Sequence, residues 1–191
     1  MQYPSLVLAA LTAVPVAAAQ YPTTRQAPAH TSDIAQAVAA LPPEHRAGAE
    51  VWQVRDGAAH QLRAGTNGFV CLADEPGNDV FFVICGSAGY ASRIKAQIAQ
   101  ATGGTASPLP DLAPGTSKAD LFGRRGPDGS LPDTLRYDVT IYFPNEAAAN
   151  MAMPSADAAL DEVGMTFMSA GRPSAHVHIR RWVATAELLG G

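Results

Sequence analysis

Residues 50–85 contain four short segments of alternating or continuous apolar residues, each separated from the next by residues that favour tight turns. One turn is Asp56-Gly57, the dipeptide best suited to a two-residue type I′ turn. Short strands joined by short turns predict a four-strand antiparallel meander. Its strands are Glu50–Arg55, Ala58–Arg63, Phe69–Leu72 and Val80–Cys85. The last strand is apolar throughout, so we expect it to be central and covered on both faces.

Helical periodicity appears on either side of this meander. A short helix is expected after Thr31-Ser32-Asp33, with Pro42-Pro43 stopping it. A second helix should run from the Ser87 cap to about Ala101. Its residues Tyr90, Ile94 and Ile98 recur every four positions and predict a buried stripe.

The second half of the chain begins with residues 103–134, which are rich in Gly and Pro and show no periodicity. We interpret this stretch as a long loop, either disordered or functional, for instance as a lid. Strands are then predicted at Tyr137–Phe143, Val163–Ser169 and Ala175–Val183, with a short helix after Asn145. About seven strands and two to three packed helices segregate along the chain, which favours a single α+β domain with a mostly antiparallel sheet over residues 31–191.

The N-terminal stretch predicts that the protein is exported. Residues 1–19 contain a short apolar run ending in Ala17-Ala18-Ala19, the small-residue pattern of a signal-peptidase site. The alternative is a flexible, Ala-rich tail on a cytosolic protein. Residues 20–30 are polar and Pro-containing, which predicts a disordered leader. We therefore expect a periplasmic or extracellular protein. Its formal charge of −4 disfavours nucleic acid and anionic membranes as partners.

Two cysteines, Cys71 and Cys85, are the only ones in the chain. In an oxidising compartment an even count indicates a disulfide. The bridge would close a loop of about 15 residues, worth about 3 kcal/mol in the chain-entropy model. Two buried thiols are the competing interpretation.

His176-Val177-His178 lies in a predicted strand, where residues two apart project from the same face. Two neutral imidazoles supply half of a tetrahedral site for a transition metal. His60 and Asp138 are the residues that could join them if the sheet brings them close. A solvated face carrying His, His and Arg180 explains the same pattern without a metal, and no other cofactor is predicted.

Three further features have a functional and a plain interpretation. Ser87, between an apolar strand and a helix, is placed like the nucleophile of a serine hydrolase, with His178 as its base. Cys85 stands where that motif has its first glycine, and a helix cap explains Ser87 fully. Arg124-Arg125 could grip a carboxylate or phosphate, or simply solubilise the loop. Trp52, Trp182 and Tyr142 could line an apolar pocket or belong to the core.

Several segments resemble a group of exported bacterial proteins without an assigned activity. The resemblance spans roughly residues 34–172. It is carried by Gly65–Leu72 (GTNGFVCL), Ile84-Cys85, Phe143-Pro144, Asn150-x-x-x-Pro154-Ser155 and Gly171-Arg172. It implies that Cys71 and Cys85 act as a pair, and it supplies no activity. This chain departs from the group in having no His-rich stretch at 133–136, and those proteins have no serine that matches Ser87.

The sequence assembles no complete catalytic constellation. We therefore expect an exported binding or structural module without catalytic chemistry, whose partner is a small molecule or a protein. A metal-dependent enzyme using His176 and His178 is the alternative, and a serine hydrolase using Ser87 is the third possibility.

Overall fold

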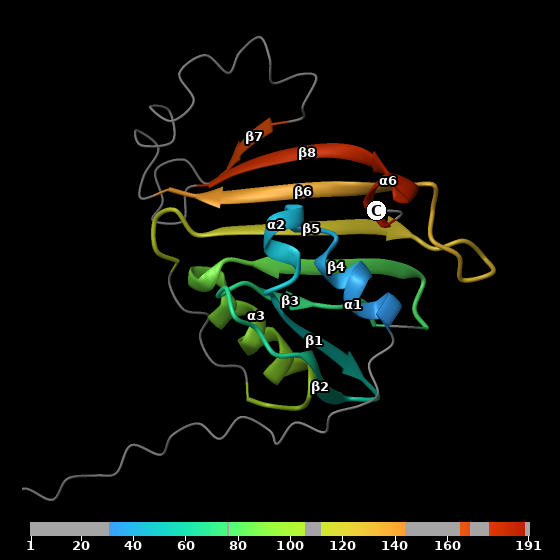
Figure 1. The fold of residues 1–191 in the computed structure, drawn as a ribbon, viewed down its shortest axis with the longest axis horizontal. Helices are drawn as coiled ribbons and strands as arrows, with labels where there is room; N and C mark the ends of the chain where they lie inside the picture. The colour runs from blue at the N-terminus through green and yellow to red at the C-terminus, as the bar shows by residue number, and fades with distance from the viewer. Residues whose placement is uncertain (1–30, 76, 106–111, 144–164, 169–175, 190–191) are drawn as a thin grey trace, which may run out of the picture.

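The computed structural model describes residues 31–75, 77–105, 112–143, 165–168 and 176–189, which form one eight-stranded sheet with helices packed against it (Figure 1). The strands and helices segregate along the chain, so the α+β class is confirmed. In chain order the elements are α1 (Thr31–Val38), α2 (Pro43–Arg46), β1 (Glu50–Arg55), β2 (Ala58–Arg63), β3 (Val70–Leu72), β4 (Val80–Gly86), α3 (Ala88–Ala101), β5 (Ser117–Arg124), β6 (Thr134–Tyr142), β7 (Met165–Met168), β8 (His176–Ala184) and α6 (Thr185–Leu189).

The order of the strands is β2-β1-β3-β4-β5-β6-β8-β7 (Figure 1). Every neighbouring pair is antiparallel except β1 and β3, which run parallel. The predicted N-terminal meander is therefore wrong: β3 adds to the far side of β1 instead of pairing with β2. The reason lies in β1, which buries Val51, Gln53 and Val54. A strand buried on both faces belongs inside a sheet, and only the more exposed β2 can serve as its edge.

The hairpin between β1 and β2 forms as the sequence predicts. Asp56 and Gly57 both have positive φ angles, 52° and 69°, the combination that a type I′ turn requires. Strand β4 is central, as expected, but it is not covered along its whole length. Its residue Phe82 keeps 39% of its surface exposed.

The expected loop at 103–134 contains strand β5, so that prediction is wrong for its middle part. Strand β5 pairs with β4 on one side and β6 on the other, in the centre of the sheet. Its buried face consists of Ala119, Leu121 and Gly123, which is too weakly apolar to stand out among the surrounding glycines and prolines. An added Cβ at Gly123 would lie 2.6 Å from a methyl group of Leu135, so the position has no room for a larger residue.

Alternation along the strands builds two cores on opposite faces of the sheet. On one face, α1, the turn after it and α6 cover side chains such as Phe81, Val83 and Leu121. On the other face, α3 packs its stripe of Tyr90, Ile94 and Ile98 against β2–β5, as its periodicity predicts.

The described residues hold four helices, more than the two to three expected. The additions are short: α6, and α2, which begins at Pro43 because proline suits the first turn of a helix. The predicted helix after Asn145 lies outside the described residues, as do residues 1–30. No helix in the described ranges is both long and apolar enough to cross a membrane.

Cys71 and Cys85 form a disulfide, as predicted. The two residues face each other in the register of β3 and β4, and neither exposes any surface. The bridge therefore joins neighbouring strands within the core.

Candidate functional site

The two histidines of β8 project from the same side of the sheet, as the sequence predicts. His176 and His178 face Tyr142 and Thr140 of β6 in the antiparallel register, while the intervening Val177 is buried on the opposite face. The two imidazole centroids lie 5.0 Å apart in an edge-to-face arrangement.

Asp138 lies beside His178 on β6, and it is almost fully buried, with 3% of its surface exposed. Its Oδ1 is 2.7 Å from Nδ1 of His178, and its Oδ2 accepts a hydrogen bond of 2.6 Å from Nε of Arg180. Burial alone would raise the pKa of the Asp138 carboxyl group, but the hydrogen bonds from Arg180 and His178 outweigh it, and the pKa is lowered. The carboxylate is therefore ionised at neutral pH.

An ionised carboxylate only accepts hydrogen bonds, so Nδ1 of His178 carries the proton in this pair. Thr140 Oγ1 is 3.2 Å from the same nitrogen. In a neutral ring, Nε2 is then the basic nitrogen, which is the tautomer of a general base or of a metal ligand held by a carboxylate.

A second buried acid lies next to Asp138. Asp120 of β5 faces Asp138 in the register, and only 4% of its surface is exposed. Nζ of Lys118 lies 2.5 Å from its Oδ2. Two adjacent carboxylates repel each other unless cations compensate them, and here Lys118 and Arg180 do so. We call the group formed by Lys118, Asp120, Asp138, Thr140, His178 and Arg180 the polar cluster.

The polar cluster lies on the α3 side of the sheet, partly on β5, which α3 contacts, and partly on β6 and β8. Helix α3 packs against β2–β5 and, through Tyr90, against Tyr142 at the end of β6. Among the described residues, Tyr142 is the only residue of β6 or β8 in the core under α3. We call the side chains of β5, β6 and β8 on this side the open face. Sequence reasoning found His178 and Asp138 but missed Lys118 and Asp120, because β5 was interpreted as loop.

Of the two residues suggested as further metal ligands, only Asp138 is close. His60 lies on β2, at the other edge of the sheet from β7 and β8. No group of three His, Cys, Asp or Glu side chains within the described ranges is placed to hold a metal ion. Metal binding by His176 and His178 stays a prediction.

Ser87 is the N-cap residue of α3, as predicted, but its hydroxyl group makes no capping hydrogen bond. Its Oγ accepts a hydrogen bond of 3.1 Å from the backbone N–H of Ser117 and lies 3.2 Å from the carbonyl oxygen of Ser117. The hydroxyl group instead joins the end of β4 to the start of β5, so only the position of the cap is confirmed. The suggestion that Ser87 is a nucleophile stays a prediction.

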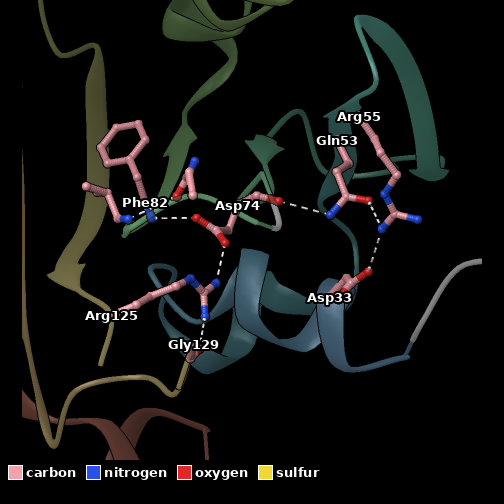
Figure 2. Close-up of polar contacts among 9 residues, drawn as sticks. Asp33, Gln53, Arg55, Asp74, Phe82, Arg125 and Gly129 are labelled. Atoms are coloured by element: carbon pink, nitrogen blue, oxygen red, sulfur yellow. Dashed lines mark hydrogen bonds and ion pairs between the residues drawn. The ribbon is translucent and has the colours of Figure 1, made fainter. Parts of the chain in front are cut away.

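Arg124 and Arg125 lie at the end of β5 and point to opposite sides of the sheet. Arg125 donates a hydrogen bond of 2.5 Å from Nη2 to Oδ2 of Asp74 and another of 3.0 Å from Nη1 to the carbonyl oxygen of Gly129 (Figure 2). Arg125 thus joins the end of β5 to Asp74 after β3 and to the turn at Gly129. Arg124 is exposed on the same side of the sheet as the polar cluster.

The aromatic residues suggested for a pocket are separated. Trp52 and Tyr142 belong to the core under α3, whereas Trp182 exposes 71% of its surface. Burial, followed by the electrostatic effect of Tyr90, raises the pKa of Tyr142 to about 12, so its phenol is neutral at any physiological pH.

Fold and site together define an α+β domain with a mixed, mostly antiparallel sheet and a polar cluster on its open face. Comparisons of the chain with protein-family models, with curated proteins and with solved structures find no match. The resemblance to exported bacterial proteins therefore stays a prediction, and the case for a function rests on the residues themselves.

Proposed function

We propose that this protein is an exported binding module without catalytic chemistry, and that it binds an anionic ligand at the open face. The observation that carries the proposal is the layering of charge in the polar cluster. The carboxylates of Asp120 and Asp138 are nearly buried, at 6% and 4% of side-chain surface, whereas Arg180 keeps 40% of its side chain exposed. An incoming ligand would therefore meet donors before acceptors.

The balance of charge on the open face supports the same proposal. Four basic side chains (Lys118, Arg124, Arg136 and Arg180) stand on it beside two acidic ones (Asp120 and Asp138). The chain as a whole carries a formal charge of −4. A basic area on an acidic protein attracts anions locally without attracting polyanions to the whole surface.

The proposal is tested by titrating the labelled protein with succinate and, separately, with inorganic phosphate. NMR follows the imidazole of His178 and the Nε–H of Arg180, with the imidazole of His60 as internal reference. We expect saturating shifts at His178 and Arg180 with a dissociation constant in the millimolar range, about 4 kcal/mol of binding free energy. Shifts that do not saturate, or that are equal at His60, would contradict the proposal.

A matched pair of variants separates binding from general effects. His178→Gln should weaken binding at least tenfold, whereas His60→Gln, the same change at the far side of the sheet, should leave it unchanged. Thermal unfolding of both variants checks that the fold survives. Arg180→Gln provides a second test within the cluster, because it removes the most exposed donor.

Export of the protein is supported by the Cys71–Cys85 disulfide, since such bonds persist in oxidising compartments. The test is mass spectrometry of the protein recovered from the medium and the periplasm. We expect a chain that starts at Gln20 and lacks two hydrogens. A chain that starts at Met1, stays in the cytosol and carries two free thiols would overturn this part of the proposal.

A metal-dependent enzyme is the second candidate. It is favoured by the contact of Asp138 with Nδ1 of His178, because a carboxylate behind a histidine orients Nε2 toward a metal. The test is elemental analysis of protein purified without chelators or affinity metals. Stoichiometric metal that is lost in His178→Ala and kept in His60→Ala would support this candidate; the absence of metal in the parent protein would remove it.

A further inference from the structure

Two large apolar side chains are exposed in the part of the chain that the structure describes, and both lie in one row across the sheet. They are Phe82, 39% exposed, and Trp182, 71% exposed. In the register of the strands, Phe82 of β4 faces Phe122 of β5, Phe122 faces Arg136 of β6, and Arg136 faces Trp182 of β8. We call Phe82, Phe122, Arg136 and Trp182 the planar row.

Arg136 belongs to this row by geometry and by its unmet hydrogen bonding. Its guanidinium carbon lies 4.9 Å from the centre of the Phe122 ring, the arrangement of a cation–π pair. Its Nε is buried and has no hydrogen-bond partner among the described residues. Such a donor is costly to bury, so a small shift of the Arg136 side chain that exposed its Nε to a ligand oxygen would gain a bond that the protein alone does not provide.

The row is long. Four neighbouring strands span three interstrand spacings, about 14 Å in all. Small molecules favour concave pockets that bury most of their surface, whereas a row of planar side chains across a sheet suits a chain of consecutive rings. Arg124 and Arg180 stand one row away from it, on either side along their strands. Arg124 places positive charge at one margin of the planar row. At the other margin the exposed Arg180 stands beside the buried carboxylates of Asp120 and Asp138, with which Lys118 and Arg180 pair.

We propose that the planar row binds an acidic polysaccharide. The weakly positive C–H groups on the faces of the sugar rings would stack on the rings of Phe82, Phe122 and Trp182, because an aromatic face is electron-rich. The carboxylates of the polymer would bind the guanidinium groups of Arg124, Arg136 and Arg180. This inference rests on the proposed function in one respect, that the open face is the binding face.

Single-stranded nucleic acid also presents stacked rings and negative charge. The formal charge of −4 opposes both polyanions, so it does not distinguish them. Nucleic acids draw much of their affinity from many phosphate contacts, and only three arginines stand along this row. A polysaccharide can draw its affinity from ring faces stacked on the aromatic side chains, with only a few of its carboxylates bound.

The experiment uses the two tryptophans of the chain, Trp52 and Trp182. In Trp52→Phe the remaining fluorescence reports on Trp182 alone. Polygalacturonate oligomers are titrated into this variant, with uncharged dextran and a thymidine oligonucleotide as separate probes. We expect polygalacturonate to shift the emission of Trp182 with saturation. Binding should weaken as salt rises, and dextran should bind at least tenfold more weakly.

Calorimetric titrations with the same probes then compare variants. Trp182→Ala should weaken polygalacturonate binding at least tenfold, and so should Arg136→Gln, whereas Trp52→Phe should match the parent protein. Because Trp182 is exposed, its replacement leaves the core intact, and circular dichroism verifies this. Binding by Trp182→Ala within twofold of the parent would overturn the inference, as would tighter binding of the oligonucleotide than of polygalacturonate.

The two proposals fail separately. If polygalacturonate does not bind while succinate still shifts the His178 resonance, the planar row is not a polysaccharide site and the anion-binding function stands. If neither probe binds, both proposals are refuted.

Discussion

Replacing Asp74 by alanine should lower the stability of the fold strongly, although the side chain changes little in size. It follows β3 and exposes 7% of its surface. Its Oδ1 accepts a hydrogen bond of 2.8 Å from the backbone N–H of Phe82, and its Oδ2 pairs with Arg125 at 2.5 Å. Its own carbonyl oxygen accepts a bond from Gln53 (Figure 2). Asp74 thereby joins β1, β4 and the segment after β5.

The magnitude follows from what Asp74→Ala would leave behind. Arg125 keeps only 16% of its side chain exposed, and its Nε already lacks a hydrogen-bond partner within the described residues. Removing one member of a buried ion pair costs about 3–5 kcal/mol. Asp74→Asn should cost about half as much, because its side-chain oxygen can still accept the N–H of Phe82 while the charge is lost.

The assay is equilibrium unfolding in urea, followed by circular dichroism. With a slope near 2 kcal/mol per molar urea, Asp74→Ala should lower the midpoint by about 1.5–2.5 M. Asp79→Ala, in the same turn but exposed, is the control and should shift the midpoint by less than about 0.3 M. If Asp74→Ala and Asp79→Ala unfold at the same urea concentration, the reasoning about this buried pair is refuted.

Four further predictions concern other parts of the molecule. Replacing Cys71 and Cys85 by serine should lower the free energy of unfolding by about 3 kcal/mol. The parent protein, denatured and refolded in dithiothreitol, should lose the same amount. Urea midpoints equal to that of the oxidised parent would contradict this. The pKa of Asp138 is lowered below its ordinary 3.8, so its ionised carboxylate stabilises the fold fully above that pH, and the stabilisation is lost as the pH falls through the lowered pKa. Asp138→Asn should therefore lose less free energy of unfolding than the parent protein between about pH 5 and pH 2. Parallel curves of stability against pH for the two proteins would contradict the assigned contacts. Since burial, with the nearby Tyr90, raises the pKa of Tyr142 to about 12, Tyr142→Phe should remove a tyrosinate absorbance step at that pH, and an unchanged titration would show that the step belongs to another residue. An added Cβ at Gly86 would lie 2.7 Å from the Cβ of Tyr90, so Gly86→Ala should lower the free energy of unfolding by about 1–3 kcal/mol in the same urea assay. An unchanged free energy of unfolding would mean that α3 can move away from β4 without cost.

The fold could be predicted from the sequence wherever a local pattern determines it. The Asp56-Gly57 turn defines the hairpin of β1 and β2, and the stripe of Tyr90, Ile94 and Ile98 identifies α3 and its buried side. Which strand β3 pairs with depends instead on how completely β1 is buried. That is a property of the assembled sheet, and no local turn encodes the parallel pairing of β1 and β3.

Strand β5 shows why a central strand can escape a search for apolar alternation. Its inward face includes Gly123, where Leu135 and Pro132 fill the space that a side chain would occupy. Its other face carries Asp120, a residue that sequence patterns assign to the surface. Here Lys118 compensates the charge at 2.5 Å, so the buried position is stable.

The candidate site was within reach of the sequence only in part, and the missing part has a single cause. The spacing of His176 and His178 correctly places both rings on one face of a strand, and the polar side of β6 correctly offers Asp138 as a neighbour. The other half of the polar cluster comes from β5. The sequence of β5 resembles a loop, so its Lys118 and Asp120 are not recognised as neighbours of β6. From the sequence, a site shared by β5, β6 and β8 is therefore seen only as the two histidines and Asp138. The features that concealed β5, a glycine under a neighbouring leucine and a paired buried carboxylate, are therefore the same features that concealed the site.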